Sequence, residues 1–225
     1  MITSPLAAGK KPPALTPFRR QASTDARIAA LEAALASRPP LRAPPLPGEA
    51  RAAVALLLRV REGRVELLLI RRAERAGDPW SGHMALPGGR AQEGDAGLAA
   101  TAARETREEV AIDVDRGGRL LGQLDDLAPR SVRVPGIVVS PFVYHVPEDA
   151  EPRPNHEVQL ALWIPVDHLL RPDAVTEYLH DLAEGETLRF PAFDARGYVV
   201  WGMTHRIVTG FLELYAQSAS PERAE

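Results

Sequence analysis

The chain has 225 residues, a formal net charge of −3 and no cysteine. This length fits one domain of ordinary size with an extension, and a hydrophobic content of 45% is enough for a buried core. The absence of cysteine excludes a disulfide scaffold, a thiol nucleophile and thiolate metal sites. No apolar run approaches the roughly 18 residues that a membrane-spanning helix needs, so we expect a soluble, cytoplasmic protein with no membrane partner.

The N-terminal segment is basic and rich in proline. Residues 1–23 lack periodic apolar positions, which predicts a flexible arm. Residues 24–48 are expected to form a short helix, for which Ser23, Thr24 and Asp25 offer N-cap oxygens, followed by a proline-rich connector. Its apolar stripe consists of Ile28, Leu31 and Leu35. Because residues 1–50 hold seven basic and three acidic side chains, a net charge of only +4, and Phe18 is their one aromatic residue, we expect no nucleic-acid partner.

Residues 49–217 have the pattern of a mixed α/β domain, and residues 218–225 are expected to be a disordered tail. Short apolar runs at 53–58 and 65–70 predict two strands. The polar, glycine-containing sequence at 61–64 between them predicts a hairpin turn.

Further strands are expected at 120–124, 137–146 and 158–164. The last of these carries apolar side chains on both faces, which is typical of a covered central strand. A short helix is expected from residue 165, and apolar residues with a period near 3.6 predict a closing helix at 202–216.

An acidic helix after two glycines carries the strongest chemical signal. On a helix over residues 98–110, apolar or small residues four apart are expected to form a buried stripe: Leu98, Ala102, Thr106 and Val110.

Three carboxylates, Glu105, Glu108 and Glu109, share another edge near the C-terminal end of this helix, where they repel each other and the helix dipole disfavours them. Mg²⁺ or Mn²⁺ would remove both conflicts. Taken alone, this charge pattern is typical of a helix face exposed to solvent. Gly88 and Gly89, which allow close backbone approach to an ion or phosphate, favour the metal site.

These residues resemble the signature of the Nudix hydrolase family, in which Gly, five residues, Glu and seven residues precede Arg-Glu-hydrophobic-X-Glu-Glu-X-Gly-hydrophobic. The matching residues are Gly89, Arg104, Glu105, Glu108, Glu109 and Ile112. The chain departs from the signature at Asp95, which replaces the first Glu one residue further from Arg104, at Thr106 and at Ala111, where glycine is usual.

The resemblance implies a Nudix-type α/β/α sandwich with a mixed sheet, plus the proline-rich N-terminal extension. It implies hydrolysis of a nucleoside diphosphate linked to another moiety, with Mg²⁺ or Mn²⁺ as cofactor. The implied metal ligands are Glu105, Glu108, Glu109 and a backbone carbonyl at Gly89. Arg104 is expected to brace the glutamates, and Glu157 is a candidate general base or further metal ligand.

The substrate is expected to be a small diphosphate. Its candidate contacts flank the glycine loop and are Arg71, Arg72, Arg75, Gly88, Gly89 and Arg90. Residues 24–215 are similar to the coenzyme A pyrophosphatase branch in the N-terminal helix, the spacing before Arg104 and the segment 198–204. The segment 68–89 departs from the pattern of that branch, because a serine is missing and the arginine spacing is shifted.

Coenzyme A or its thioesters are therefore the first expectation. ADP-ribose, NADH or nucleotide sugars are the alternatives within the family. A catalytically silent nucleotide-sensing module is a second class of function, and a homodimer stays among the open options.

Overall fold

The computed structural model describes residues 25–44, 48–75, 77, 80–128, 136–181 and 187–219. The predicted arm at 1–23 lies outside these residues. The last helix includes Ser218 and Ala219, which the sequence assigned to the tail, and the rest of that tail also lies outside the described residues. Within the described part of the chain, none of the helices is long and apolar enough to cross a bilayer.

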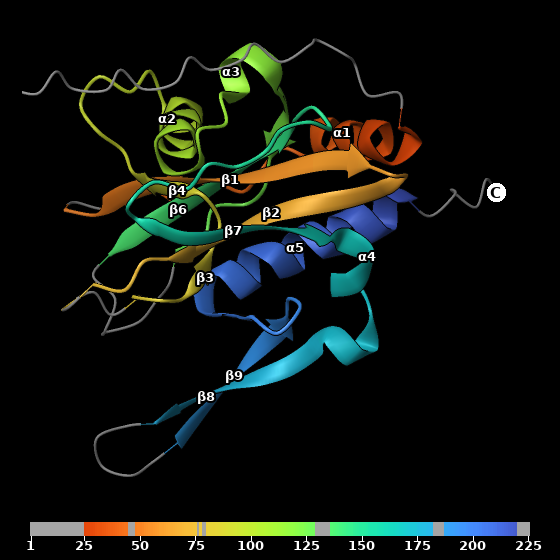
Figure 1. Cartoon of the computed structure of the whole chain (residues 1–225). Coiled ribbons are helices and arrows are strands. Elements are labelled where there is room, and N and C mark those ends of the chain that lie inside the picture. The colour runs from red at the N-terminus through yellow and green to blue at the C-terminus, as the bar shows by residue number, and fades with distance from the viewer. Residues whose placement is uncertain are drawn as a thin grey trace, which may run out of the picture.

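The chain folds into two sheets and five α-helices in its described residues (Figure 1). The strands are β1 (Ala50–Arg61), β2 (Arg64–Arg72), β3 (Met84–Ala85), β4 (Gly88–Arg90), β5 (Arg119–Gln123), β6 (Ile137–His145), β7 (Val158–Pro165), β8 (Val175–Asp181), β9 (Thr187–Asp194) and β10 (Val199–Trp201). The helices are α1 (Ala26–Ser37), α2 (Leu98–Val110), α3 (Val114–Gly117), α4 (Val166–Leu169) and α5 (Gly202–Ala219), with a 3₁₀ turn at Pro172–Ala174.

The larger sheet has seven strands and is mixed. β1 pairs in parallel with β6 and antiparallel with β2 and β4, and the order along the main path is β3-β2-β1-β6-β5. β7 pairs antiparallel with the outer edge of β2. β1 and β6 are therefore the covered central strands: eight of the nine residues of β6 and seven of the twelve residues of β1 are buried.

Helices cover both faces of this sheet. Along β1, Ala53, Ala55 and Leu57 face a core that includes residues of α2 and α3, whereas Leu56 and Leu58 face a core formed with α1 and α5. This alternation is the period-2 pattern of a strand buried on both sides. Figure 1 shows α2 and α3 above the sheet and α5 below it. The result is the predicted α/β/α sandwich with a mixed sheet.

The predicted elements around the first hairpin are confirmed. β1 and β2 are joined by Glu62 and Gly63, both with positive φ angles (50° and 72°), as in the tight turns that match strand twist. The predicted short helix after residue 165 is α4, and the closing helix is α5.

The prediction of β7 as a covered central strand is wrong. Among the described strands it pairs with β2 alone, and its residues from Gln159 to Leu162 are exposed or half-buried. An edge strand can carry apolar side chains on both faces when loops and helices cover part of it, so periodicity alone cannot assign its place in the sheet.

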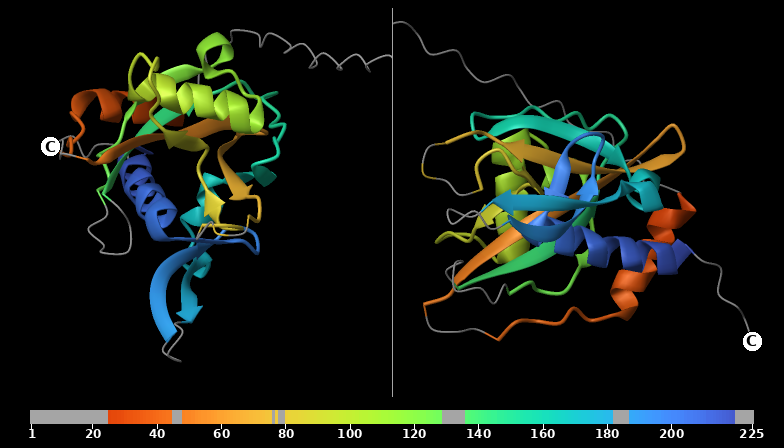
Figure 2. Two further views of the ribbon diagram at one scale, coloured as in Figure 1. Left: turned by 90° about the vertical axis from the view of Figure 1, so that its left-hand side faces the viewer. Right: turned by 90° about the horizontal axis from the view of Figure 1, so that it is seen from below.

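A second sheet of three strands, with the order β10-β9-β8, was not expected from the sequence. Its hairpin projects from the sandwich (Figure 2, left). Pro191 lies inside β9, and a proline inside a segment argues against a strand in a sequence-based assignment. The strands form nevertheless because β8 and β9 pair along their whole length.

Candidate functional site

Helix α2 is fixed to the sheet by the predicted stripe. Ala102, Thr106 and Val110 are fully buried against β1 and its neighbours, while Leu98 is half-buried at the first turn. The hydroxyl of Thr106 donates to the carbonyl of Ala102 at 2.7 Å, so a polar residue is satisfied at a hydrophobic position of the family signature.

The helix ends at Ala111, which has φ 56° and ψ 25°. Its N–H donates to the carbonyl of Arg107 at 3.1 Å, which closes the helix in a left-handed cap. The turn therefore does require a positive φ, and alanine adopts it at a cost of about 1–2 kcal/mol relative to glycine.

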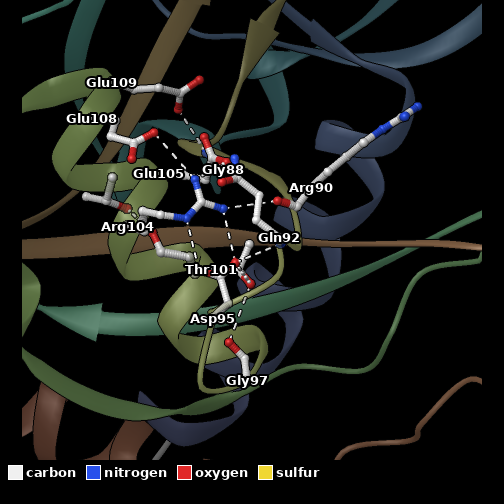
Figure 3. Close-up of polar contacts among 12 residues, drawn as sticks. Gly88, Arg90, Gln92, Asp95, Gly97, Thr101, Arg104, Glu105, Glu108 and Glu109 are labelled. Carbon is white, nitrogen blue, oxygen red and sulfur yellow. Dashed lines mark hydrogen bonds and ion pairs between the residues drawn. The ribbon is translucent and has the colours of Figure 1, made fainter.

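Arg104, in the middle of α2, joins this helix to the preceding loop (Figure 3). Its Nε and Nη2 atoms donate to the two carboxylate oxygens of Asp95 at 2.9 and 3.1 Å. Nη2 also donates to the carbonyl of Arg90 at 3.1 Å, and Nη1 donates to Glu105 at 2.7 Å and to Glu108 at 3.4 Å. Arg104 therefore holds Glu105 and Glu108, in agreement with the expectation that it braces the glutamates.

Asp95 receives further donors from its own loop. The hydroxyl of Thr101 donates to it at 2.8 Å and the backbone N–H of Gln92 at 3.0 Å. The hydrogen bond with Arg104, followed by these two, lowers the pKa of Asp95 well below its ordinary value. Asp95 thus anchors the loop and the arginine.

Glu109 lies near the C-terminal end of α2 in a different environment. Its side chain is buried, and its carboxylate accepts a hydrogen bond from the backbone N–H of Gly88 at 2.9 Å. Burial raises the pKa of Glu109 to about 7, and the negative charges of Glu105 and Glu157 act in the same direction. The Gly88 N–H and the positive charge of Arg72 oppose this shift.

The two glycines of the preceding loop allow these close approaches. A Cβ atom at Gly88 would lie 2.3 Å from the carbonyl oxygen of Ala53, and one at Gly89 would lie 2.5 Å from the carboxyl carbon of Glu105. Only glycine therefore lets the loop pass between β1 and the acidic edge of α2.

Glu157 reaches this region through the end of α2. The N–H of Asn155 donates to the carbonyl of Glu109 at 2.9 Å, and the Asn155 side-chain oxygen accepts from the Glu157 N–H at 2.7 Å. Glu157 then pairs with Arg75 at 3.0 Å. The sequence predicted Glu157 but missed Asn155, whose position after Pro154 in a turn was the available signal.

The other predicted arginines are spread around the same loop. Arg71 donates through Nε to the carbonyl of Gly82 at 3.0 Å, and Arg72 follows it at the end of β2. Arg90 contributes its carbonyl to the Arg104 network, but Figure 3 shows its side chain extending away from the three glutamates. The positive charge of Arg72 acts on Glu109, and Arg75 forms an ion pair with Glu157. These two arginines therefore interact with the carboxylates, whereas the Arg90 side chain points away from them.

The donor set fits a hard divalent cation by its chemistry. Glu105, Glu108 and Glu109 project from one edge of α2 beside the glycine loop (Figure 3), and Gly89 provides a cradle that a Cβ would fill. Within the described residues, however, no three acidic or histidine side chains converge as a metal cluster. Glu105 and Glu108 are instead held by the guanidinium of Arg104.

Comparison with known proteins decides the family. The NUDIX domain family matches residues 49–182, which hold the larger sheet, α2 and the glycine loop. The chain belongs to this family. The uncharacterized Nudix hydrolase NudL of Citrobacter koseri is 33% identical over 168 residues, covering 70% of this chain and 79% of that protein.

The chain spans different shares of its other relatives. An uncharacterized protein of Schizosaccharomyces pombe is 37% identical over 131 residues, and the chain spans 40% of its length. A crystal structure of a NUDIX hydrolase from Alicyclobacillus acidocaldarius has a TM-score of 0.53 at 17% identity, covering 80% of this chain and all of that one, which supports the fold. The family and the relatives named as Nudix hydrolases support the predicted enzyme class, a pyrophosphohydrolase.

Proposed function

We propose that the protein is a Mg²⁺- or Mn²⁺-dependent pyrophosphohydrolase whose substrate is coenzyme A or one of its thioesters. The observation that carries the metal dependence is the buried Glu109 carboxylate, which among the described residues accepts a hydrogen bond from one backbone N–H, that of Gly88, and lies close to two further carboxylates. A bound divalent ion supplies charge neutralisation for these groups and for the phosphoryl oxygens, and it lowers the pKa of the attacking water.

In this proposal the side chains of the chain divide the work. Glu105, Glu108 and Glu109, with the carbonyl of Gly89, hold the metal, and Arg104 keeps the first two in register. Glu157 accepts the proton of the attacking water, because its carboxylate is half-exposed and lies close enough to Glu109 to raise the pKa of that group.

The arginines bind the substrate in the same proposal. Arg71, Arg72 and Arg75 surround the end of β2, and the N–H groups of the glycine loop lie beside them. Guanidinium groups suit the planar, multiple hydrogen bonding of phosphate oxygens. Water adds to one phosphorus, the bridging P–O bond breaks, and two phosphomonoesters leave.

Coenzyme A is favoured over other diphosphates by features on both sides of the segment that matches the NUDIX domain family. The N-terminal helix α1 packs with α5 in one core through Leu31, Leu35 and Phe211, and residues 198–204 lead into α5. Both features resemble the coenzyme A pyrophosphatase branch, and they lie outside residues 49–182.

A mass-spectrometric assay of diphosphate-linked metabolites with Mn²⁺ tests this proposal. Coenzyme A should give adenosine 3′,5′-bisphosphate and 4′-phosphopantetheine, at a higher kcat/KM than ADP-ribose, NADH and nucleotide sugars. The Glu109→Gln variant is the matched control for contaminating hydrolases. A higher kcat/KM for another diphosphate would replace coenzyme A as the substrate, and binding without any product would favour a nucleotide sensor.

A further inference from the structure

One face of the three-stranded sheet is aromatic. Tyr178 is paired with Phe190, His180 with Leu188, and Trp201 with Ala192, so these side chains project to the same side of the sheet. We call the group Tyr178, His180, Phe190 and Trp201 the aromatic face.

Trp201 is at the centre of this group. Its ring stacks on Tyr178 with the centroids 4.0 Å apart and an angle of 17°, and Phe190 lies 5.3 Å away. His180 lies 6.2 Å from the same ring. Tyr178, Phe190 and Trp201 are half-buried and His180 is exposed, so part of the aromatic face is accessible from solvent.

The opposite face of the same sheet attaches it to the sandwich. Phe193 and Val200 are buried in the core shared with α5, and Phe193 lies 4.6 Å from the ring of His205. The sheet is therefore anchored by residues of the opposite face and not by the rings of the aromatic face. The fold leaves them beside the larger sheet rather than inside a core.

The aromatic face is continuous with the candidate active site. The ring of Trp201 lies 5.0 Å from that of His83, and the carbonyl of His83 accepts a hydrogen bond from the N–H of Arg72 at 3.0 Å. On the other side of that strand end, the N–H of Ala73 donates to the carbonyl of Glu157 at 2.8 Å. The aromatic rings, the arginines and the carboxylates therefore lie next to one another in space around the end of β2.

We propose that the aromatic face binds the planar base of the substrate by stacking, while the attached phosphates lie at the arginines and the glycine loop. This inference rests on the proposed function only in requiring a nucleotide-type diphosphate, and it holds for any base. Stacking suits every nucleobase because each has a π-face. Glu177 of β8 pairs with Arg189 on the opposite face of the sheet, so its negative charge lies away from the aromatic face. The aromatic face therefore suits an uncharged base.

The test compares adenosine 5′-monophosphate with ribose 5-phosphate, which lacks the base, by isothermal titration calorimetry. The wild-type protein should bind the nucleotide about tenfold or more tightly than the sugar phosphate. Trp201→Leu and Tyr178→Leu should reduce this ratio towards one. Leu179→Ala, a change of an exposed residue on the opposite face of the same strand, should leave it unchanged.

Kinetics on the substrate with the highest rate provide the second measurement. Trp201→Leu should raise KM about tenfold with kcat within about twofold of the wild type, and Trp201→Phe should restore KM because it keeps an aromatic ring. If the leucine variant fails to fold, Tyr178→Leu and Trp201→Phe still report the ratio.

Three outcomes separate the two proposals. A wild-type preference for the nucleotide that Trp201→Leu removes supports base stacking even if no diphosphate is hydrolysed, in which case the proposed function fails alone. Active enzyme with the same binding ratio in wild type and Trp201→Leu overturns the stacking site alone. A dimer that Trp201→Leu dissociates in sedimentation experiments, with the ratio unchanged, also overturns it.

Discussion

The carboxylates of Asp95, in the loop before α2, and of Glu109, near the C-terminal end of α2, lie in opposite environments. Asp95 receives donors from Arg104, Thr101 and Gln92, and its pKa is lowered. The buried Glu109 receives one backbone N–H and lies near other carboxylates, and its pKa is raised to about 7. Asp95, with several donors, acts as an anchor, whereas we propose that Glu109, with fewer donors and like charges nearby, binds a cation.

Replacing the carboxylate that is short of donors should have the largest effect. Glu109→Gln keeps the acceptor for the Gly88 N–H but removes the charge. We expect hydrolysis to fall by more than about 100-fold, beyond the 10- to 100-fold typical of groups that merely orient metal ligands. Rates are measured with Mn²⁺ on the best substrate. Glu93→Gln, an exposed carboxylate in the loop before α2, should keep its rate.

The free energy of unfolding should depend on Glu109 between pH 4.5 and about 7. The folded-state pKa is raised above 4.5, so over this window the folded protein holds a proton that the unfolded chain has lost. Stability of the metal-free protein should therefore fall as pH rises, by on the order of 3 kcal/mol. Urea unfolding from pH 5 to 8 measures it.

Two comparisons identify the group responsible for this pH dependence. Glu109→Gln should flatten the slope, and Mg²⁺ or Mn²⁺ should raise the stability of the wild type at pH 8. A slope that persists unchanged in the variant would assign the effect to another group.

Changing the glycine loop beside Glu105 should have an intermediate effect. In Gly89→Ala the new Cβ would lie 2.5 Å from the carboxyl carbon of Glu105 and displace it. We expect kcat/KM to fall about 10- to 100-fold while the protein stays folded by circular dichroism. Gly94→Ala lies in the same loop in open space at φ +102°, so it should lower stability but spare activity.

Weakening the anchor should have the smallest effect on catalysis. Asp95→Asn keeps the size of the side chain but loses the charged pair with Arg104. We expect about a tenfold loss of kcat and a lower unfolding midpoint at neutral pH. Because the pKa of Asp95 is lowered, its contribution to the free energy of unfolding is present above its ordinary pKa and is lost as pH falls. The decrease in stability of the wild type at acidic pH should therefore be smaller in Asp95→Asn.

A larger loss of turnover in Asp95→Asn than in Glu109→Gln would reverse the assignment of roles to the two carboxylates. Steady-state rates for both variants under the same metal concentration decide between the two orders.

Local sequence patterns were sufficient for much of the sandwich and the acidic edge. Glu105, Glu108 and Glu109 meet because residues three and four apart share one side of a helix, and the hairpin at Glu62 and Gly63 follows from turn chemistry. These are relationships between near neighbours, so the sequence determines them directly.

Contacts between distant segments were decided by the tertiary structure. β7 has the composition of a central strand but lies at an edge, and Glu157 comes near Glu109 because Asn155 binds the end of α2. The aromatic face forms because the register of β8, β9 and β10 aligns rings from three strands beside His83. Strand order and register depend on which surfaces can be buried together across the whole chain, and no local period encodes that choice.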